Sequence, residues 1–325
     1  MGIRFTSSGV LTTIQDAGRF GYRSVGIGPG GPMDEFAFRC ANFLIGNPDH
    51  TAALEFFYPG PELVFEESGM VSLTGLGIEA ELNGEQIPGW RPIAVSKNSV
   101  LKIRSRIGAV GYLGVGGGIK SEEWLGSSST HLTARKGGFE GRAIRKGDLL
   151  EFCTRVEVKS SVVHRWGVGA KQLEYVYGSN KHLSVLPGPE LDWIGPASVE
   201  QFSTQSFSIL PASNRMGYRL SSNALPIQKS IQLISSPVDV GTVQLLPDGQ
   251  AIVLMADHQT TGGYPRLASV AAFDLPRLAQ SLGHREVCFS WISMESAVEL
   301  NRIWHDTLEA LRQGCLLNAG RYLYQ

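Results

Sequence analysis

Residues 71–84 read VSLTGLGIEAELNG, and this stretch decides the fold class. Two short runs, at 71–74 and 79–82, have the length of strands, and Asn83-Gly84 follows the second run. An Asn-Gly pair that follows one short strand and leads into another is a strong signal for a tight hairpin, because both residues tolerate a positive φ. The stretch therefore predicts short antiparallel strands joined by tight turns.

The same pattern continues along most of the chain. Short strands are predicted at 63–65, 71–74, 79–82, 93–95, 100–103 and 110–115, and a second series at 184–186, 206–210, 230–234, 240–246, 251–255 and 287–291. A tight turn is predicted at Asp248-Gly249, and the less patterned residues 155–182 are interpreted as a linker. Strands at this spacing favour barrels or sandwiches. We expect a mainly β protein with a few helices, with domains at 1–170 and 180–325.

Three helices are predicted between the strands. The first begins after Asp34, a plausible N-cap, and ends at residues 46–48, which read Gly-Asn-Pro. A short second helix lies near residues 274–280. The third begins after Ser293 and carries the apolar stripe Ala297, Leu300, Trp304, Leu308 and Leu311. We expect this stripe to pack on its own domain, the alternative being a partner-binding helix.

The composition excludes several classes of function. The 325 residues carry a net charge of −1 with scattered Lys and Arg, which argues against nucleic acid as a partner. No apolar run approaches the roughly 20 residues that span a bilayer, and the N-terminus has no signal-peptide pattern. We expect a cytoplasmic protein without a membrane partner. Its four cysteines form no C-x-x-C pair and are expected to be free thiols.

Most common catalytic signatures are missing from the sequence. It has no G-x-x-x-x-G-K-[ST] loop for ATP, no G-x-S-x-G nucleophile motif and no H-E-x-x-H motif. The seven histidines are dispersed, so no metal site is recognised. The function must therefore rest on less familiar polar segments.

The first of these segments, residues 257–265, reads DHQTTGGYP and follows an apolar strand. Polar groups at the end of a strand lie at a sheet rim, where sites are built. Asp257 and His258 are candidate acid–base residues, and Thr260 and Thr261 are candidates to hold a polar substrate. The predicted binding set from this segment is completed by Gln259, Gly262, Gly263 and Tyr264. The alternative is an elaborate turn.

Two other segments carry arginines. The first comprises residues 15–19 and 30–34 and contains Arg19, Asp34 and several glycines. Glycines let backbone N–H groups approach an anion closely, and Arg19 can bind a carboxylate or phosphate. The alternative is a loop tied down by an Arg–Asp pair. In residues 213–220, Arg215 and Arg219 are candidates to bind a carboxylate, a phosphoryl group or an acidic surface of a partner, with a plain surface role as the alternative.

The order of these segments resembles one family. The matching stretches are residues 12–19, 33–34, 41–42, 46–47, 186–189, 215–220, 241–244 and 257–265. They are similar to the KipA family, also called allophanate hydrolase subunit 2, which includes the C-type subunits of 5-oxoprolinases and the A and B subdomains of biotin-dependent urea carboxyltransferases. The resemblance implies two cyclophilin-like β-barrel domains.

The resemblance also implies an activity that belongs to a complex. It implies the C-type subunit of an ATP-dependent 5-oxoprolinase, which opens the lactam of 5-oxoproline to L-glutamate together with a KipI-like and a LamB/YcsF-like subunit. Within that reaction, Asp257, His258 and Arg215 are the expected catalytic residues, and Arg19, Asp34 and Arg219 join residues 259–264 as substrate-binding residues. A lactam carbonyl is a poor electrophile, and phosphorylation by ATP would activate it.

Two alternatives remain at this stage. One is a carboxyltransferase or allophanate-hydrolase type of subunit that acts on urea or a related amide with carboxybiotin. The other is a regulatory protein that binds and antagonises a KipI-like protein. The sequence also departs from the family pattern at Gly30, where relatives have serine, at Ser236, where they often have glutamate, and at His258, where Arg or Gly is more usual. Such departures predict either a changed substrate or variation of the loops.

Overall fold

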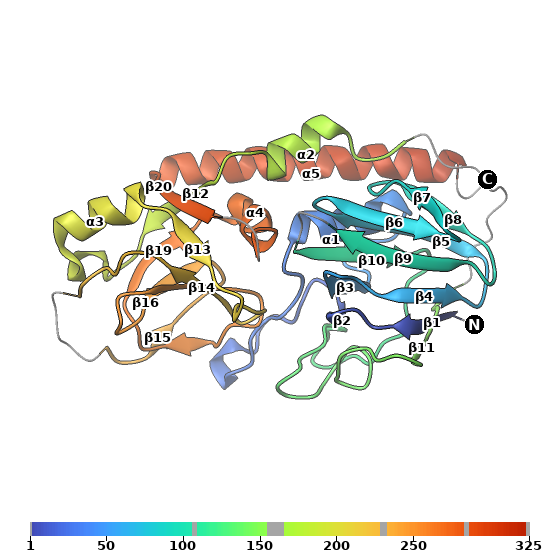
Figure 1. The fold of residues 1–325 in the computed structure, drawn as a ribbon, viewed down its shortest axis with the longest axis horizontal. Coiled ribbons are helices and arrows are strands. Elements are labelled where there is room, and N and C mark those ends of the chain that lie inside the picture. The colour runs from blue at the N-terminus through green and yellow to red at the C-terminus, as the bar shows by residue number, and fades with distance from the viewer. Residues whose placement is uncertain (1, 106–108, 155–165, 228–232, 283–285, 323–325) are drawn as a thin grey trace. The chain divides into compact units, whose positions relative to one another are not determined.

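A computed structural model describes residues 2–105, 109–154, 166–227, 233–282 and 286–322 (Figure 1). Contacts divide the chain into two compact units. The first unit comprises Met1–Arg19, Gly30–Leu173 and Thr307–Gln325. The second comprises Phe20–Pro29 and Glu174–Asp306.

This division exchanges two segments relative to the boundaries predicted at 1–170 and 180–325. Phe20–Pro29 joins the second unit, where the Arg23 guanidinium lies 3.0 Å from the Asp239 carboxylate. Thr307–Gln325 joins the first unit, where Ala319 packs in a cluster with Ile45 and Met70. Both exchanges depend on contacts between residues far apart in sequence, and a local pattern does not encode such contacts.

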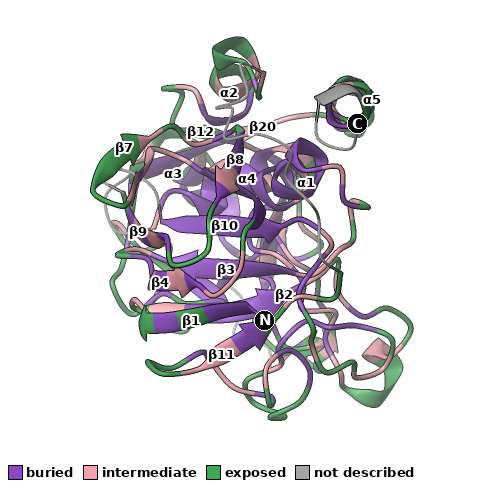
Figure 2. Ribbon diagram, turned by 90° about the vertical axis from the view of Figure 1, so that its right-hand side faces the viewer, coloured by how far each residue is buried: buried purple, intermediate pink, exposed green. Residues whose placement is uncertain are grey.

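The first unit is built from two antiparallel sheets. One has the strand order β11 (Leu149–Glu151), β1 (Gly2–Ser7), β4 (Glu62–Phe65), β9 (Val100–Ser105), β6 (Ile78–Leu82) and β7 (Glu85–Ile87). The other has the order β2 (Leu11–Gln15), β3 (Ala53–Phe57), β10 (Val110–Val115), β5 (Gly69–Gly75) and β8 (Pro92–Val95). The core cluster draws on both sheets, with Phe5 and Leu63 from the first and Leu54 and Leu113 from the second. Figure 2 shows β3 and β10 as buried strands.

The hairpin predicted at Asn83-Gly84 is confirmed. Leu82 pairs with Glu85, and Asn83 and Gly84 have φ values of 55° and 87°. Positive φ at both turn positions is the geometry that matches the twist of the flanking strands. The turn residues therefore set the register of β6 and β7.

Helix α1 (Glu35–Leu44) covers a polar face of the five-stranded sheet. Asp34 caps the helix, its Oδ1 accepting from the Ala37 N–H at 3.0 Å, as predicted. The Thr74 hydroxyl of β5 donates to the Ala37 carbonyl at 2.7 Å, which ties the helix to the sheet. The helix ends at Leu44, and Gly46 follows with φ of 71°, in agreement with the predicted stop.

The second unit is a closed barrel. Its strand order is β12 (His182–Pro187), β19 (Arg266–Val270), β16 (Thr242–Leu245), β17 (Ala251–Leu254), β14 (Gly217–Ser221), β13 (Phe207–Ile209) and β20 (Glu286–Trp291), and a parallel pairing of β12 with β20 closes it. A separate pair joins β15 (Ser236–Pro237) to β18 (Thr261–Gly262). The mainly β class is confirmed. Residues 230–232 of one predicted strand lie outside the described residues.

The remaining helices are α2 (Ala170–Tyr177), α3 (Gly195–Thr204), α4 (Leu275–Ala279) and α5 (Met294–Tyr322). Ser293 caps α5, accepting from the Ser296 N–H at 3.2 Å, as predicted. Trp304 and Leu308 of its apolar stripe are buried, and the stripe continues to Ala319. Among the described helices, none combines the length and apolarity needed to cross a bilayer. The four cysteines are free thiols, as predicted.

Candidate functional site

A groove of about 540 Å³ lies on the barrel of the second unit. Its floor includes Ile252 and Leu254 of β17, while Val253 between them is fully buried. Because side chains alternate along a strand, Ile252 and Leu254 share one face and Val253 points to the other. Arg219 and Tyr264, both predicted to bind substrate, line the groove, as does Gln259. The groove therefore combines an apolar floor with polar walls.

Arg219 supplies a cation to this groove. It is exposed on β14, between the fully buried Tyr218 and Leu220. Within the described residues, no hydrogen bond or ion pair engages its guanidinium group. A guanidinium group presents a fork of N–H donors that matches a carboxylate or phosphate. Arg219 is thus free to bind an anionic ligand.

Arg215 and Asp257 form a bidentate ion pair near the groove. Arg215 Nε lies 2.8 Å from Asp257 Oδ2, and Nη2 lies 2.8 Å from Oδ1. Arg215 precedes β14 and Asp257 follows β17, and the two strands pair with Gly217 opposite Leu254. The side chains are 4% and 17% exposed, respectively, so the guanidinium group is enclosed while an edge of the carboxylate stays accessible. The pair fixes the Asp257 carboxylate after the end of β17 with one edge accessible.

His258 is enclosed by the fold. Its side chain is 0% exposed, and Nδ1 lies 2.8 Å from the Met255 carbonyl oxygen. Nε2 lies 3.9 Å from Asp239 Oδ1. Burial lowers the pKa of His258 from its ordinary value, because the charged imidazolium would lose its hydration. Its predicted acid–base role stays a prediction, and the geometry does not present the ring to a ligand.

Gln259 and Tyr264, the first and last residues of the segment 259–264, line the groove. Gln259 Nε2 donates to Gln244 Oε1 at 3.4 Å, and the Thr260 carbonyl accepts from the Val238 N–H at 3.2 Å. Thr261 and Gly262 form β18, which pairs with β15. Gly263 continues the segment to Tyr264, whose exposed fraction is 44%. The segment is a structured turn and also contributes side chains to the groove.

Arg19 and Asp34 belong to the first unit, whereas all other predicted site residues belong to the second. Arg19 is 1% exposed, donates to the Ser129 carbonyl, and its guanidinium group lies 5.0 Å from the Trp124 ring centroid. Asp34 is fully buried as the cap of α1. Both side chains hold backbone segments of their own unit together. Their role in a shared site stays a prediction.

Sequence reasoning did not single out Gln244 as a site residue. It lies on β16 with 1% exposure and lines the groove beside Gln259. A polar residue inside a strand usually indicates a solvent-facing position, so the sequence carries no signal that this amide is buried. Its burial becomes apparent only when residues 259–264 fold over it.

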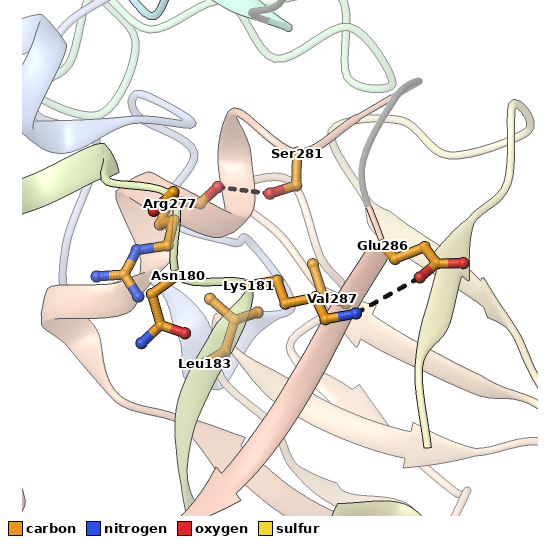
Figure 3. A pocket seen from close by; sticks show the side chains of 8 residues that line it. Asn180, Lys181, Leu183, Arg277, Ser281, Glu286 and Val287 are labelled. Atoms are coloured by element: carbon orange, nitrogen blue, oxygen red, sulfur yellow. Dashed lines mark hydrogen bonds and ion pairs between the residues drawn. The ribbon is translucent and has the colours of Figure 1, made fainter. Parts of the chain in front are cut away.

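A second hollow of about 390 Å³ lies beside β12 and β20 (Figure 3). Lys181 Nζ lies 3.8 Å from Glu286 Oε2 there, and Arg277 lies 3.2 Å from the Asp274 carboxylate. Arg277 also donates to the carbonyl oxygens of Val176 and His182, so its charge is used to hold the barrel end together. Across the described residues, no group of three potential metal ligands is found.

Comparisons with known proteins agree with the resemblance seen in the sequence. The family model for the carboxyltransferase domain, subdomain A and B, matches residues 25–291. The chain is 38% identical to the C subunit of 5-oxoprolinase from Escherichia coli, over 91% of this chain and 93% of that protein. It is 34% identical to the C subunit of 5-oxoprolinase from Haemophilus influenzae, over 93% of this chain and 94% of that protein.

A solved structure gives the same assignment. The crystal structure of the K. lactis urea amidolyase superposes with a TM-score of 0.87 at 27% identity, over 95% of this chain. The chain spans only 20% of that much longer protein. The chain belongs to the family of carboxyltransferase domains that contain subdomains A and B.

Proposed function

We propose that the chain is the C-type subunit of an ATP-dependent 5-oxoprolinase and that its barrel groove holds 5-oxoproline. A KipI-like protein and a LamB/YcsF-like protein complete the proposed complex. The two relatives named as 5-oxoprolinase C subunits support this assignment, since each is matched over more than nine-tenths of its length. The observation that carries the proposal is the groove, which gathers Arg219, Gln259 and Tyr264 around an apolar floor.

The chemistry of 5-oxoproline suits this groove. The molecule carries one carboxylate and a small ring with a lactam carbonyl and N–H. Arg219 pairs with the carboxylate, and Ile252 and Leu254 support the ring. The amide of Gln259 faces the polar edge of the lactam. A mostly apolar pocket with a few fixed polar groups is typical of small-molecule sites.

The reaction requires activation of the lactam. The lactam oxygen attacks the γ-phosphorus of ATP, ADP leaves, and water adds to the activated carbon. The C–N bond then breaks and the nitrogen takes a proton, which leaves γ-glutamyl phosphate. A second water hydrolyses this acyl phosphate to phosphate and L-glutamate. Asp257 accepts a proton from the water, and Arg215 keeps that carboxylate in place through its bidentate contact. We assign the nucleotide to no residue of this chain.

Turnover by the reconstituted complex tests the proposal. The chain is co-expressed with its KipI-like and LamB/YcsF-like partners, and glutamate release from 5-oxoproline is measured with and without ATP. We expect ATP-dependent glutamate release that disappears when this chain is omitted. Arg219→Ala should raise KM about tenfold, corresponding to ~1.4 kcal/mol of binding. A folded, complete complex that releases no glutamate would refute the proposal.

A carboxyltransferase is the second candidate. The urea amidolyase with a TM-score of 0.87 favours it, because fold and chain coverage agree closely. This candidate predicts transfer of a carboxyl group from carboxybiotin to urea or a related amide, without ATP hydrolysis by the complex. Transfer of labelled carboxyl from carboxybiotin, measured on the same preparation, separates the two candidates. A complex that assembles but catalyses neither reaction would favour a regulatory, KipI-binding role.

A further inference from the structure

We infer that Gln244 is a positioning residue that orients Gln259, so that the Gln259 carbonyl oxygen accepts a hydrogen bond from the lactam N–H. The inference rests on the proposed function and adds a determinant of specificity to it. The class of ligand it defines is a small carboxylate that carries an unsubstituted secondary lactam or amide.

The first support is the contact between the two amides. Gln244 is 1% exposed, and its Oε1 accepts from Gln259 Nε2 at 3.4 Å. The oxygen and nitrogen of an amide lie on opposite sides of the carbonyl carbon. When Gln259 directs its nitrogen toward Gln244, its oxygen is directed elsewhere, and Gln259 is an exposed residue that lines the groove. No hydrogen bond to Gln259 Oε1 occurs within the described part of the chain.

The second support is the space around Gln244. A Cβ atom added at Gly262 would collide with Gln244 Nε2 and would lie 3.3 Å from Val238 Cγ1. The φ of Gly262 lies outside the left-handed region, so the backbone itself does not require glycine. Gly262 is buried, and the missing side chain leaves room for the amide. The glycine therefore leaves the space that the Gln244 amide occupies in this orientation.

The third support is a cost in stability. Gln244 Nε2 is buried and has no hydrogen-bond partner among the residues that the structure describes. A buried donor without a partner costs about 1–3 kcal/mol. An apolar residue of the same length would avoid that cost, so a stability argument alone does not explain glutamine at this position. A role in orienting Gln259 does explain it.

The orientation predicts a clear selectivity. An acceptor oxygen in the groove recognises the N–H of 5-oxoproline and is left without a partner by its N-methyl derivative. Loss of one such hydrogen bond changes affinity by about tenfold, or ~1.4 kcal/mol. If Gln259 instead presented its NH₂ group, the lactam carbonyl would be the recognised atom, and the N-methyl derivative would bind through the same contact.

The experiment compares variants in the assembled complex by kinetics and thermal unfolding. Gln244→Met is expected to raise KM for 5-oxoproline about tenfold with little change in kcat. The preference of the complex for 5-oxoproline over N-methyl-5-oxoproline should fall to near one. The unfolding midpoint should stay equal or rise. Gln244→Glu retains an acceptor for Gln259, so its KM should stay near the wild-type value. Gly262→Ala should raise KM as Gln244→Met does, but its added methyl group should lower the unfolding midpoint, because it collides with Gln244 Nε2. A control outside the groove is Gln201→Met, which removes a Gln–Gln contact of 3.3 Å that Gln201 of α3 donates to Gln205, the residue that follows the helix.

The outcomes separate this inference from the proposed function. A wild-type complex that releases no glutamate overturns both. Glutamate release by the wild type, together with an unchanged KM in Gln244→Met, overturns the inference alone. A raised KM with undiminished preference over the N-methyl derivative also overturns it, because Gln244 would then act on a different part of the ligand.

Discussion

At the scale of single residues, the ion pair between Arg215 and Asp257 allows a chemical role to be separated from a structural one. Arg215 is 4% exposed, so Asp257→Asn removes the charge of the carboxylate that pairs with this buried guanidinium group. The expected cost is roughly 3 kcal/mol of stability, and turnover should fall about a hundredfold or more if Asp257 is the base. Urea denaturation and glutamate release measure the two effects.

The control for this experiment removes both charges. The double variant Arg215→Met, Asp257→Leu replaces the pair by apolar side chains, which often restores stability. We expect its unfolding midpoint to recover toward that of the wild type while turnover stays low. Wild-type turnover in the double variant would show that the pair has only a structural role.

His258 gives a prediction for the dependence of stability on pH. Burial lowers its pKa in the native state, whereas the unfolded chain keeps a value of about 6.5. Below that pH the unfolded state binds a proton that the native state does not, so stability falls as the pH falls. His258→Gln should flatten this dependence between about pH 6.5 and pH 5, as measured by urea midpoints. His50→Gln, at an exposed position, controls for the loss of an imidazole. An unchanged slope in His258→Gln contradicts the prediction.

Several site residues were predictable from the sequence for a local reason. Gln259 and Tyr264 belong to the polar segment that follows β17, and segments at strand ends tend to line grooves. Arg219 alternates with buried residues within β14, so its side chain faces outward. The burial of Arg19 and of Gln244 was not predicted, because each depends on a distant segment. Arg19 is buried against Ser129 and Trp124, and Gln244 is buried against Gly262. The residues next to such a side chain in the sequence give no signal that it is buried.

At the scale of elements, strands and tight turns were predicted better than helices. The Asn83-Gly84 turn and the Asp34 cap are local chemistry, and the structure confirms both. Helix α3 was not predicted, because only Gly195, Ser198 and Phe202 of its ten residues are buried. Gly and Ser at two of these positions leave no apolar stripe in the sequence.

The apolar stripe of α5 gives the prediction at this scale. Leu308 is 2% exposed and Leu317, on the same helix, is 75% exposed. Leu308→Ala should destabilise the protein by about 2–5 kcal/mol, because it removes buried methyl groups and leaves a cavity. Leu317→Ala is the matched control and should change stability by less than about 0.5 kcal/mol. Urea unfolding measures both, and equal midpoints for the two variants would contradict burial of the stripe.

At the scale of the whole molecule, the sequence predicted two units but not the exchange of segments between them. Phe20–Pro29 belongs to the second unit through Arg23, which contacts Asp239 and the Val238 carbonyl. Thr307–Gln325 belongs to the first unit. Composition and turn signals divide a chain only where its local pattern changes. Helix α5 belongs to the second unit up to Asp306 and to the first unit from Thr307. Because the helix is continuous, its local sequence pattern does not change at that boundary.

The C-terminal exchange has a testable consequence. A chain that stops after Asp306 loses Cys315 and Ala319, which are buried in the first unit, while the barrel strands keep all their partners. Ala319 packs with Ile45 and Met70, so the segments around these two residues lose part of their cover. Because local opening depends on local packing, amide hydrogen exchange should accelerate around Ile45 and Met70, and much less in β16 and β17. Equal acceleration in both units, or none in either, would show that Thr307–Gln325 does not stabilise the first unit selectively.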